Sequence, residues 1–415
     1  MKRVILHDID SHIPNLALMK LSTHYRNRGW EVRLLRVPRA KGKHPAFEGD
    51  LHLASAVFFT DVSRARLQAL QDTYGNRIEV GGSGFSLEKR LSPDIDALFP
   101  DYSLYDHSLY ALGFLTRGCN KRCSFCVVPA KEGRLKRLAY SFDDFVPPNQ
   151  RNVMLLDDNL LAFSGVESLL EEMIRRRYAV NFSQTLDIAY LSEEKAALLR
   201  QIDYQSARFS NRMIYFSLNY ARTNHHFADR RDLLRAFGED CVTVVCIYGF
   251  DTSLSEDYQR FHLLRRFRLI PFFQEYWPIR GVPSRLPAPF FDMDLKLMIR
   301  LTFRANGYNW EKYLRWLNRR YFEEFGRFYR PLVEVIFRYN YKHRLQWYLD
   351  RADWMTDEMY RDFRDSPPGG ARTFLAGLGT GRQAGLQASN GIREIAAIFD
   401  EAAGMNSDPL TRASV

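Results

Sequence analysis

Three cysteines lie close together at positions 119, 123 and 126, and their Cys-x3-Cys-x2-Cys spacing is the pattern in this chain best suited to chemistry. Three thiolates on one short loop can each ligate one iron of a [4Fe–4S] cluster, for which proteins ordinarily supply four cysteines. The missing fourth ligand leaves one iron with an open position, which is typical of a catalytic metal rather than a structural one. The spacing therefore predicts Cys119, Cys123 and Cys126 as ligands of a reactive iron–sulfur cluster.

A zinc site, a ferredoxin-type cluster and coincidence are weaker interpretations of this spacing. A zinc site would need four ligands, usually arranged as two pairs, and no second pair of Cys or His stands near residues 119–126. A ferredoxin would need a fourth cysteine. Chance spacing of buried cysteines is the remaining alternative.

Two further cysteines, Cys241 and Cys246, are left over. They are five residues apart on one predicted strand, so they point to opposite faces and cannot both line one pocket. Burial as small hydrophobic side chains is the default interpretation. The alternative is a thiol that serves as a hydrogen donor, an auxiliary ligand or a binding site for a thiophilic substrate, and Cys246 is the candidate for that role.

Length and composition bound the class of protein. A chain of 415 residues is long enough for two or three domains. No run of about 18 apolar residues predicts a membrane span, and the start of the chain, where a short strand soon meets acidic residues, is not typical of a signal peptide. With five cysteines in all, no disulfide framework is implied. These features favour a protein of the reducing cytoplasm without a membrane partner.

The net charge is +10, from 59 Lys and Arg against 49 Asp and Glu. Such an excess is compatible with an anionic small substrate or with nucleic acid. The charge is spread along the chain and rich in arginine rather than gathered in one segment, so the sequence favours a small-molecule substrate over nucleic acid.

Residues 1–100 are predicted to form a small α/β domain. Short apolar runs predict strands, and apolar positions at helical spacing predict a helix over 14–29. Strands that alternate with helical patterns indicate a parallel, doubly wound sheet of the Rossmann-like kind. The predicted strands cover 4–7, 31–35, 54–59 and 77–80.

Residues 101–285 are predicted to form a partial (βα)6 barrel, because continuous apolar runs alternate with helical segments as in parallel strands buried on both faces. A site in such a barrel lies at the carboxyl ends of the strands, and the three-cysteine run begins just after the first of them. The predicted strands cover 111–116, 152–157, 179–184, 213–218, 242–249 and 270–276.

The remainder divides in two. Residues 286–365 carry aromatic side chains at near-helical spacing and are predicted to form a helical C-terminal domain whose aromatics are core, with a substrate lid or a nucleic-acid surface as the alternative. Residues 366–415 are rich in Gly and Ala and are expected to be a partly disordered tail.

The run from Thr116 to Cys126 resembles the cluster loop of the radical S-adenosylmethionine (radical SAM) superfamily, in which an aromatic residue commonly precedes the third cysteine, as Phe125 does here. The resemblance implies a [4Fe–4S] cluster whose open iron chelates the amino and carboxylate groups of SAM. It also implies an external electron donor such as a flavodoxin or a ferredoxin.

Asp157, Asp158 and Asn159 stand at the end of the second predicted barrel strand and should lie at the mouth of the barrel. Acids there can accept hydrogen bonds from an ammonium group. In radical SAM enzymes this position holds the amino group of SAM, often through a Gly-Gly-Glu segment that this chain lacks. It resembles instead the acidic form found in the cobalamin-type group. Helix capping by Asp158 or Asn159 is the alternative.

The ends of the next three predicted strands resemble further SAM-binding positions. The polar ends of the third and fourth strands correspond to positions that bind the ribose and carboxylate, and the fifth strand resembles the one that flanks adenine; the residues are Gln184, Ser217, Asn219 and Gly249. Polar strand ends can also simply satisfy loop backbone. Glu275 and Tyr276 close the sixth strand, and with Cys246 they are the candidates for facing the substrate.

The first 100 residues resemble the cobalamin-binding-type domain that precedes the barrel in one large radical SAM group. Residues 10–12, Asp-Ser-His, look like the start of an Asp-x-His-x-x-Gly motif that ligates cobalt, but Asn15 stands where the glycine is expected. The Gly81-Gly82 turn corresponds to a glycine turn of that domain. Cobalamin is thus a candidate second cofactor. The alternative is that the N-terminal sheet binds no cofactor and only supports the barrel.

By the resemblance, one electron from the cluster cleaves a C–S bond of SAM, and the usual 5′-deoxyadenosyl radical abstracts hydrogen from a small-molecule substrate. If cobalamin binds, methyl transfer is the leading expectation. The main alternative is transfer of the 3-amino-3-carboxypropyl group, since a radical SAM enzyme of the arsinothricin pathway, which joins that group to trivalent arsenic, is similar in architecture.

Two further alternatives remain. An RNA-modifying radical SAM enzyme of the methylthiotransferase kind would carry three further cysteines, and this chain has two. From another class, a nonenzymatic iron–sulfur or nucleic-acid-binding protein also stays open. The sequence as a whole favours a biosynthetic transferase that uses SAM.

Overall fold

The computed structural model describes residues 1–276 apart from short gaps, which cover 37–46, 106–108, 135–136, 220–223, 239–240, 249, 251–259, 261–262 and 265–266. The predicted helical region 286–365 and the predicted tail 366–415 therefore lie outside the described residues.

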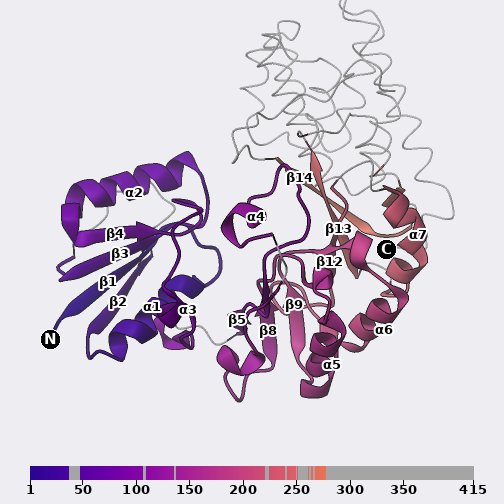
Figure 1. The fold of residues 1–415 in the computed structure, drawn as a ribbon, viewed down its shortest axis with the longest axis horizontal. Helices are drawn as coiled ribbons and strands as arrows, with labels where there is room; N and C mark the ends of the chain where they lie inside the picture. Colours follow the sequence, from indigo (N-terminus) through magenta and orange to yellow (C-terminus); the bar gives the residue numbers. More distant parts are fainter. Residues whose placement is uncertain are drawn as a thin grey trace, which may run out of the picture. The chain divides into compact units, whose positions relative to one another are not determined.

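The N-terminal part is a parallel four-stranded sheet in the order β2-β1-β3-β4. Its elements are β1 (Arg3–Asp8), α1 (Leu16–Arg26), β2 (Glu31–Arg36), β3 (Leu51–Ser55), α2 (Asp61–Tyr74) and β4 (Ile78–Gly81). Helix α1 packs against one face of the sheet, where Leu18 and Met19 meet Val4 and Leu6. Helix α2 packs against the other face through Leu67, Leu70 and Tyr74. A sheet covered by helices on both faces is the doubly wound arrangement (Figure 1).

The third strand begins and ends earlier than predicted: β3 covers Leu51–Ser55 rather than 54–59. The apolar residues that suggested the longer strand, Val57 and Phe58, are 38% and 40% exposed. Their backbone N–H groups donate to the carboxylate of Asp10, at 2.7 and 3.1 Å. These two N–H groups are therefore satisfied by a side chain and not by the backbone of a neighbouring strand.

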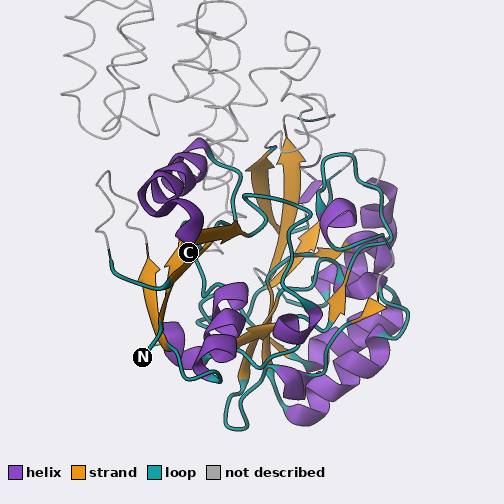
Figure 2. Ribbon diagram, turned by 60° about the vertical axis from the view of Figure 1, so that its left-hand side comes forward, coloured by secondary structure: helices purple, strands orange, loops and turns teal. Residues whose placement is uncertain are grey.

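The following part contains two further four-stranded sheets, ordered β11-β9-β8-β5 and β10-β12-β13-β14. Strand β5 pairs in parallel with β8, β8 with β9, and β10 with β12. Helices α5 and α6 lie on the outer side of the first of these sheets (Figures 1 and 2). The elements are β5 (Ala111–Gly113), β8 (Asn152–Leu155), α5 (Val166–Arg176), β9 (Ala179–Phe182), β10 (Leu186–Asp187), α6 (Glu193–Gln201), β11 (Asp203–Tyr204), β12 (Ile214–Ser217), α7 (Asn224–Arg235), β13 (Val242–Tyr248) and β14 (Ile270–Glu275).

Shorter elements lie in the segments between these strands and helices. They are α3 (Pro93–Asp96), β6 (Thr116–Arg117), α4 (Val128–Lys131) and β7 (Arg137–Leu138), with 3-10 helices at Gly75–Arg77, Tyr102–Tyr105, Phe142–Asp144, Leu160–Ala162 and Ile188–Tyr190. Strands β6 and β7 form a small antiparallel ladder around the three-cysteine run.

The predicted α/β class is confirmed in its coarse form, a mixed fold with parallel sheets. All six apolar runs predicted as strands over 111–276 contain a strand. Strands β8 and β9 stop before Asp157 and Gln184, whereas β12 and β14 end at Ser217 and Glu275. Strands β10 and β11 were not predicted, because two-residue strands leave no periodic signal. Closure of the strands into one partial barrel stays a prediction.

The described residues belong to two compact units. One comprises Met1–Ser217 and Asp229–Thr243, and the other comprises Leu218–Ala228 and the residues from Val244 onward. The predicted domain boundaries at residues 100 and 285 stay predictions. No helix within the described ranges is long and apolar enough to cross a membrane.

Candidate functional site: the three-cysteine loop and the strand ends that hold it

The three cysteines lie on a loop that leaves β6 and ends in α4. Gly118 begins this loop with a φ of +82°, a left-handed backbone conformation that glycine adopts without strain. The N–H of Cys119 donates to the carbonyl of Gly133 at 3.3 Å and closes the base of the loop, and the N–H of Cys126 donates to the carbonyl of Cys123 at 3.1 Å. The loop is thus shaped by its own backbone as well as by its side chains.

The three thiols are half-buried and free of disulfides. Burial raises the pKa of the Cys126 thiol to about 11; the N–H of Val128 opposes this, and the nearby Cys123 and Cys119 add to it. A metal ligand must be the thiolate, so a bound cation is what would offset the cost of charge at this position.

Among the described residues, no three His, Cys, Asp or Glu side chains converge as they would on a single metal ion. A [4Fe–4S] cluster takes one thiolate on each iron, so its ligands surround a larger body and need not converge on one point. Three half-buried thiols on one loop, none of them in a disulfide, are a donor set that fits such a cluster.

Two acids at the carboxyl end of β8 fasten the loop. The carboxylate of Asp157, which is 5% exposed, accepts the N–H of Leu115 at 3.0 Å, the N–H of Thr116 at 2.7 Å and the Thr116 hydroxyl. The carboxylate of Asp158 accepts the N–H of Gly118 at 3.1 Å. Both predicted site residues therefore orient the backbone that leads into Cys119.

Asn159 lies next in the chain and is 5% exposed. Its side chain makes no capping hydrogen bond to the following 3-10 helix, so the predicted capping alternative is wrong for this residue. Within the described part of the chain, its Oδ1 atom is buried without a hydrogen-bond partner. Burying an unsatisfied acceptor costs free energy, and a bound ligand that donates a hydrogen bond would remove that cost.

A second attachment joins the loop to β10. Lys121, which lies between the first two cysteines, forms an ion pair of 2.5 Å with Asp187 and lies 5.6 Å from the ring centroid of Tyr190. Asp187 is the register partner of Ser217 in the neighbouring strand β12, so the predicted site residue Ser217 lies on the strand beside this ion pair. Gln184 is exposed on the loop after β9.

A buried ionic network surrounds the residue that precedes the loop. Arg117 forms ion pairs with Asp96 at 3.3 Å and with Glu132 at 3.0 Å, and the Tyr140 hydroxyl donates to Asp96 at 2.6 Å. Burial favours the neutral acid, but Arg117, Tyr140 and Lys20 outweigh it and hold the pKa of Asp96 below its usual range. Because Asp96 ends α3 and Glu132 follows α4, the network ties both ends of the loop to the region after the N-terminal sheet.

The remaining predicted site residues belong to the other unit. Asn219 accepts the N–H of Ile247 at 3.2 Å through its side chain, so it satisfies backbone in this structure. Cys246 is fully buried on the face of β13 that also buries Val244 and Tyr248, which favours the small-hydrophobe interpretation of this thiol. Tyr276 is 4% exposed.

Two predicted residues fall outside what is described. Gly249 lies outside the described residues, and for Glu275 only the backbone, at the end of β14, is described. The residues that sequence reasoning missed are Asp96, Glu132 and Tyr140. Their partners are far away in the sequence, and no local pattern distinguishes them from other charged or aromatic surface positions.

The carboxyl edge of the N-terminal sheet is held together by its own side chains. Asn15, where the cobalt-ligating motif has glycine, caps α1 and donates to Ser55 at 3.0 Å. Gly82 has a φ of +90°, and a Cβ there would meet the Ala56 carbonyl at 2.1 Å. Internal packing therefore accounts for both residues, while His12 is exposed beside Phe58, with ring centroids 5.3 Å apart.

No profile of a known protein family matches the chain, and no curated protein matches it either.

Proposed function

We propose that this protein is a radical SAM enzyme that holds a [4Fe–4S] cluster on Cys119, Cys123 and Cys126 and acts as a transferase on a small molecule. The observation that carries the proposal is the three-cysteine loop fastened by Asp157 and Asp158 to the carboxyl end of β8. Carboxyl ends of parallel strands are where barrel enzymes place their sites. The finer fold assignment, a Rossmann-like domain followed by a partial (βα)6 barrel, belongs to the same proposal.

The unsatisfied Oδ1 of Asn159 supports a SAM site beside the loop. An ammonium group donates hydrogen bonds and accepts none, so a buried amide oxygen next to a carboxylate suits the amino group of SAM. Asp158 contributes negative charge one residue away while it also accepts the Gly118 N–H. In this proposal Asn159 binds the amino group, Asp157 holds the loop backbone, and Ser217 or Gln184 contacts the rest of the molecule.

When bound and reduced by an external donor such as a flavodoxin or a ferredoxin, the cluster supplies the electron that cleaves a C–S bond of SAM. The protein's own part is to hold the thiolates and to restrict water at the site, since the reaction generates a carbon radical. The ion pair of Lys121 with Asp187 attaches the cysteine loop to β10.

The test begins with anaerobic reconstitution of the full chain with iron and sulfide, reduction with dithionite, and mass spectrometry of the SAM-derived nucleosides. The wild-type protein should bind about four irons and cleave SAM. Cys123→Ala should lose both properties. Cys241→Ala is the matched control, because Cys241 is also half-buried and free but lies outside the loop, and it should retain both. Retained cleavage in Cys123→Ala would refute the cluster assignment.

The nucleoside products also separate the reactions. 5′-Deoxyadenosine would indicate the usual radical pathway, and S-adenosylhomocysteine with it would indicate methyl transfer. Methylthioadenosine would indicate transfer of the 3-amino-3-carboxypropyl group and would make a thiophilic acceptor such as trivalent arsenic the first substrate to test.

Cobalamin remains a proposed second cofactor of the N-terminal sheet. Ligands of doubly wound sheets bind at the carboxyl edge where strand order reverses, which here lies between β1 and β3. His12, Val57 and Phe58 are exposed at that edge, so an imidazole and apolar surface are available to a large planar ligand. Hydroxocobalamin that stays with the desalted protein, with a spectrum altered by His12→Ala, would support binding. Protein that retains no corrinoid absorbance would exclude it.

A further inference from the structure

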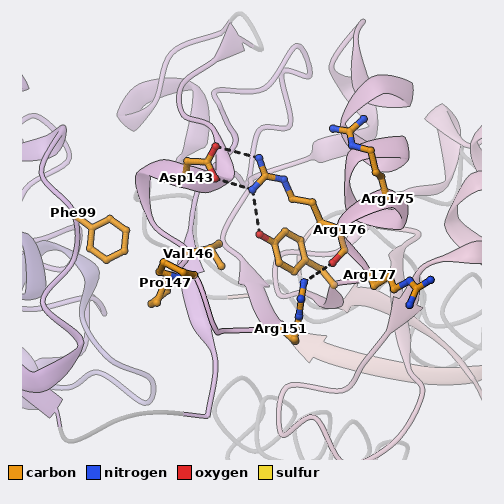
Figure 3. Close-up of a pocket in the computed structure, with 10 residues that line it drawn as sticks. Phe99, Asp143, Val146, Pro147, Arg151, Arg175, Arg176 and Arg177 are labelled. Atoms are coloured by element: carbon orange, nitrogen blue, oxygen red, sulfur yellow. Dashed lines mark hydrogen bonds and ion pairs between the residues drawn. The ribbon is translucent and has the colours of Figure 1, made fainter.

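A cavity of about 570 Å³ lies at the amino ends of β8 and β9, lined on one side by four arginines. Arg151 immediately precedes β8, and Arg175, Arg176 and Arg177 end helix α5. Figure 3 shows the arginines gathered on one side and Phe99 on the opposite side. Val146 and Pro147 lie between Phe99 and the arginines. The cavity thus has a cationic wall and an apolar wall.

Arg176 and Arg151 are already part of the framework. The guanidinium of Arg176 binds both carboxylate oxygens of Asp143, at 2.7 and 3.1 Å, and pairs with Glu172 at 2.8 Å. Arg151 donates to the backbone carbonyl of Arg176 at 2.9 Å. These contacts offset the charge of Asp143, which lines the cavity, and of Glu172, and they hold the end of the helix in place.

Arg175 and Arg177 are not committed in the same way. The side chain of Arg175 is 72% exposed and approaches Glu172 no closer than 3.9 Å. The side chain of Arg177 is exposed, and within the part of the chain that the structure describes no hydrogen bond or ion pair engages it. Two guanidinium groups therefore remain available to an anion from outside.

The backbone conformation of Arg177 is also unusual for a residue with a side chain. Arg177 ends α5 in the left-handed conformation, with φ 53° and ψ 45°, while its N–H donates to the carbonyl of Ile174. Glycine is the usual residue at this position, because a side chain is disfavoured there. Arginine at a left-handed position, with no side-chain hydrogen bond or ion pair among the described residues, indicates a role for the side chain beyond folding.

The cavity is on the far side of the strands from the three-cysteine loop. The loop is fastened beyond the carboxyl end of β8, whereas Arg151 precedes its amino end, and the strand is four residues long. Four residues of strand separate the two regions by on the order of 13 Å. A ligand here is therefore not the SAM of the proposed reaction.

We propose that this arginine-lined cavity binds the phosphate groups of a small ligand that also carries a planar ring, of which a nucleotide is the simplest example. Guanidinium groups match phosphate oxygens through paired hydrogen bonds. The volume lies within the range of small-molecule sites. Phe99 and Pro147 form an apolar surface across from the arginines, where a ring can pack.

Isothermal titration calorimetry of the full chain with uridine 5′-diphosphate tests the proposal, with uridine as the uncharged comparison. This probe avoids adenine, so SAM in excess should not displace it. Uridine 5′-diphosphate should bind saturably and at least about tenfold more tightly than uridine, and inorganic pyrophosphate should compete with it. Absence of saturable binding, or displacement by SAM, would overturn the proposal.

Variants locate the site. Arg175→Ala combined with Arg177→Gly should weaken uridine 5′-diphosphate binding about tenfold or more. Arg64→Ala, which removes an equally exposed arginine from α2, should leave binding unchanged. Arg177→Gly suits the left-handed backbone, so the midpoint of urea unfolding should not fall, and weaker binding cannot then be ascribed to misfolding. Equal affinity of the double variant and the wild type for uridine 5′-diphosphate would refute the assignment. Tighter binding of a single-stranded RNA than of uridine 5′-diphosphate, lost in the double variant, would also refute it.

Discussion

Replacing Asp157 by Asn tests how the cysteine loop is held. The substitution keeps the size and shape of the side chain but exchanges one accepting oxygen for an amide that can only donate. In the structure Oδ2 accepts the N–H of Leu115 at 3.0 Å, while Oδ1 accepts the N–H of Thr116 at 2.7 Å and the Thr116 hydroxyl. An asparagine can satisfy the donors of one oxygen, so it leaves at least one buried backbone N–H without a partner.

The expected cost follows from these contacts. An unsatisfied buried N–H costs about 1–3 kcal/mol, and hydrogen bonds that lose an ionised acceptor fall to about half their strength. Asp157 is 5% exposed and Leu115 and Thr116 are fully buried, so solvent offers little compensation. Together these effects should destabilise the start of the loop by about 3 kcal/mol, which corresponds to roughly a 150-fold change in a local opening equilibrium.

Hydrogen–deuterium exchange of the apoprotein measures this change directly, because it reports local opening without requiring the whole chain to unfold in one step. Peptides covering residues 115–118 should exchange about 100-fold faster in Asp157→Asn. Asp158→Asn is the matched control: it alters the hydrogen bond from the Gly118 N–H, and the amide oxygen of asparagine can still accept that bond, so exchange should change less than about fivefold. Equal effects of the two substitutions, or wild-type exchange in Asp157→Asn, would refute the assignment of Asp157 as the main anchor.

Three further perturbations have defined outcomes. Arg117→Met should lower the free energy of unfolding by roughly 1–3 kcal/mol in urea titrations, because it removes the guanidinium that joins Asp96 to Glu132, while Lys20 and Tyr140 still contact Asp96; Arg117→Lys should recover only part of the loss. Gly82→Ala should lower it by at least about 2 kcal/mol, since the new Cβ meets backbone and the φ is left-handed, whereas Gly81→Ala, which meets no atom within 4 Å, should cost less than about 1 kcal/mol. Burial lowers the pKa of His52, so the unfolded chain binds its proton first as pH falls; stability should decline below about pH 6.5, and His52→Asn should reduce that slope.

Local sequence was informative wherever the structure depends on neighbours in the chain. The runs that became β8 and β9 were recognisable because strands buried in a parallel sheet are continuously apolar. The exception, β3, shows the limit of this rule. The apolar residues Val57 and Phe58 lie in a loop because Asp10, 47 and 48 residues earlier, binds their amides.

The strand ends show the same division. Sequence placed Asp157, Asp158 and Asn159 together after a strand but did not distinguish their roles. Only the folded chain shows that the first two carboxylates bind the backbone of the cysteine loop while the amide oxygen of Asn159 is left without a partner among the described residues. That distinction depends on donors some 40 residues away.

The sequence alone was enough to predict a cysteine loop, an alternation of strands and helices, and polar residues near the strand ends. All three are properties of short segments of the chain. The tertiary structure alone decided which acids hold the loop, how Arg117 joins Asp96 to Glu132, and that the arginines of α5 meet Arg151 at the opposite ends of the strands. Those arrangements depend on contacts between residues distant in the chain, and such contacts leave no periodic trace in the sequence.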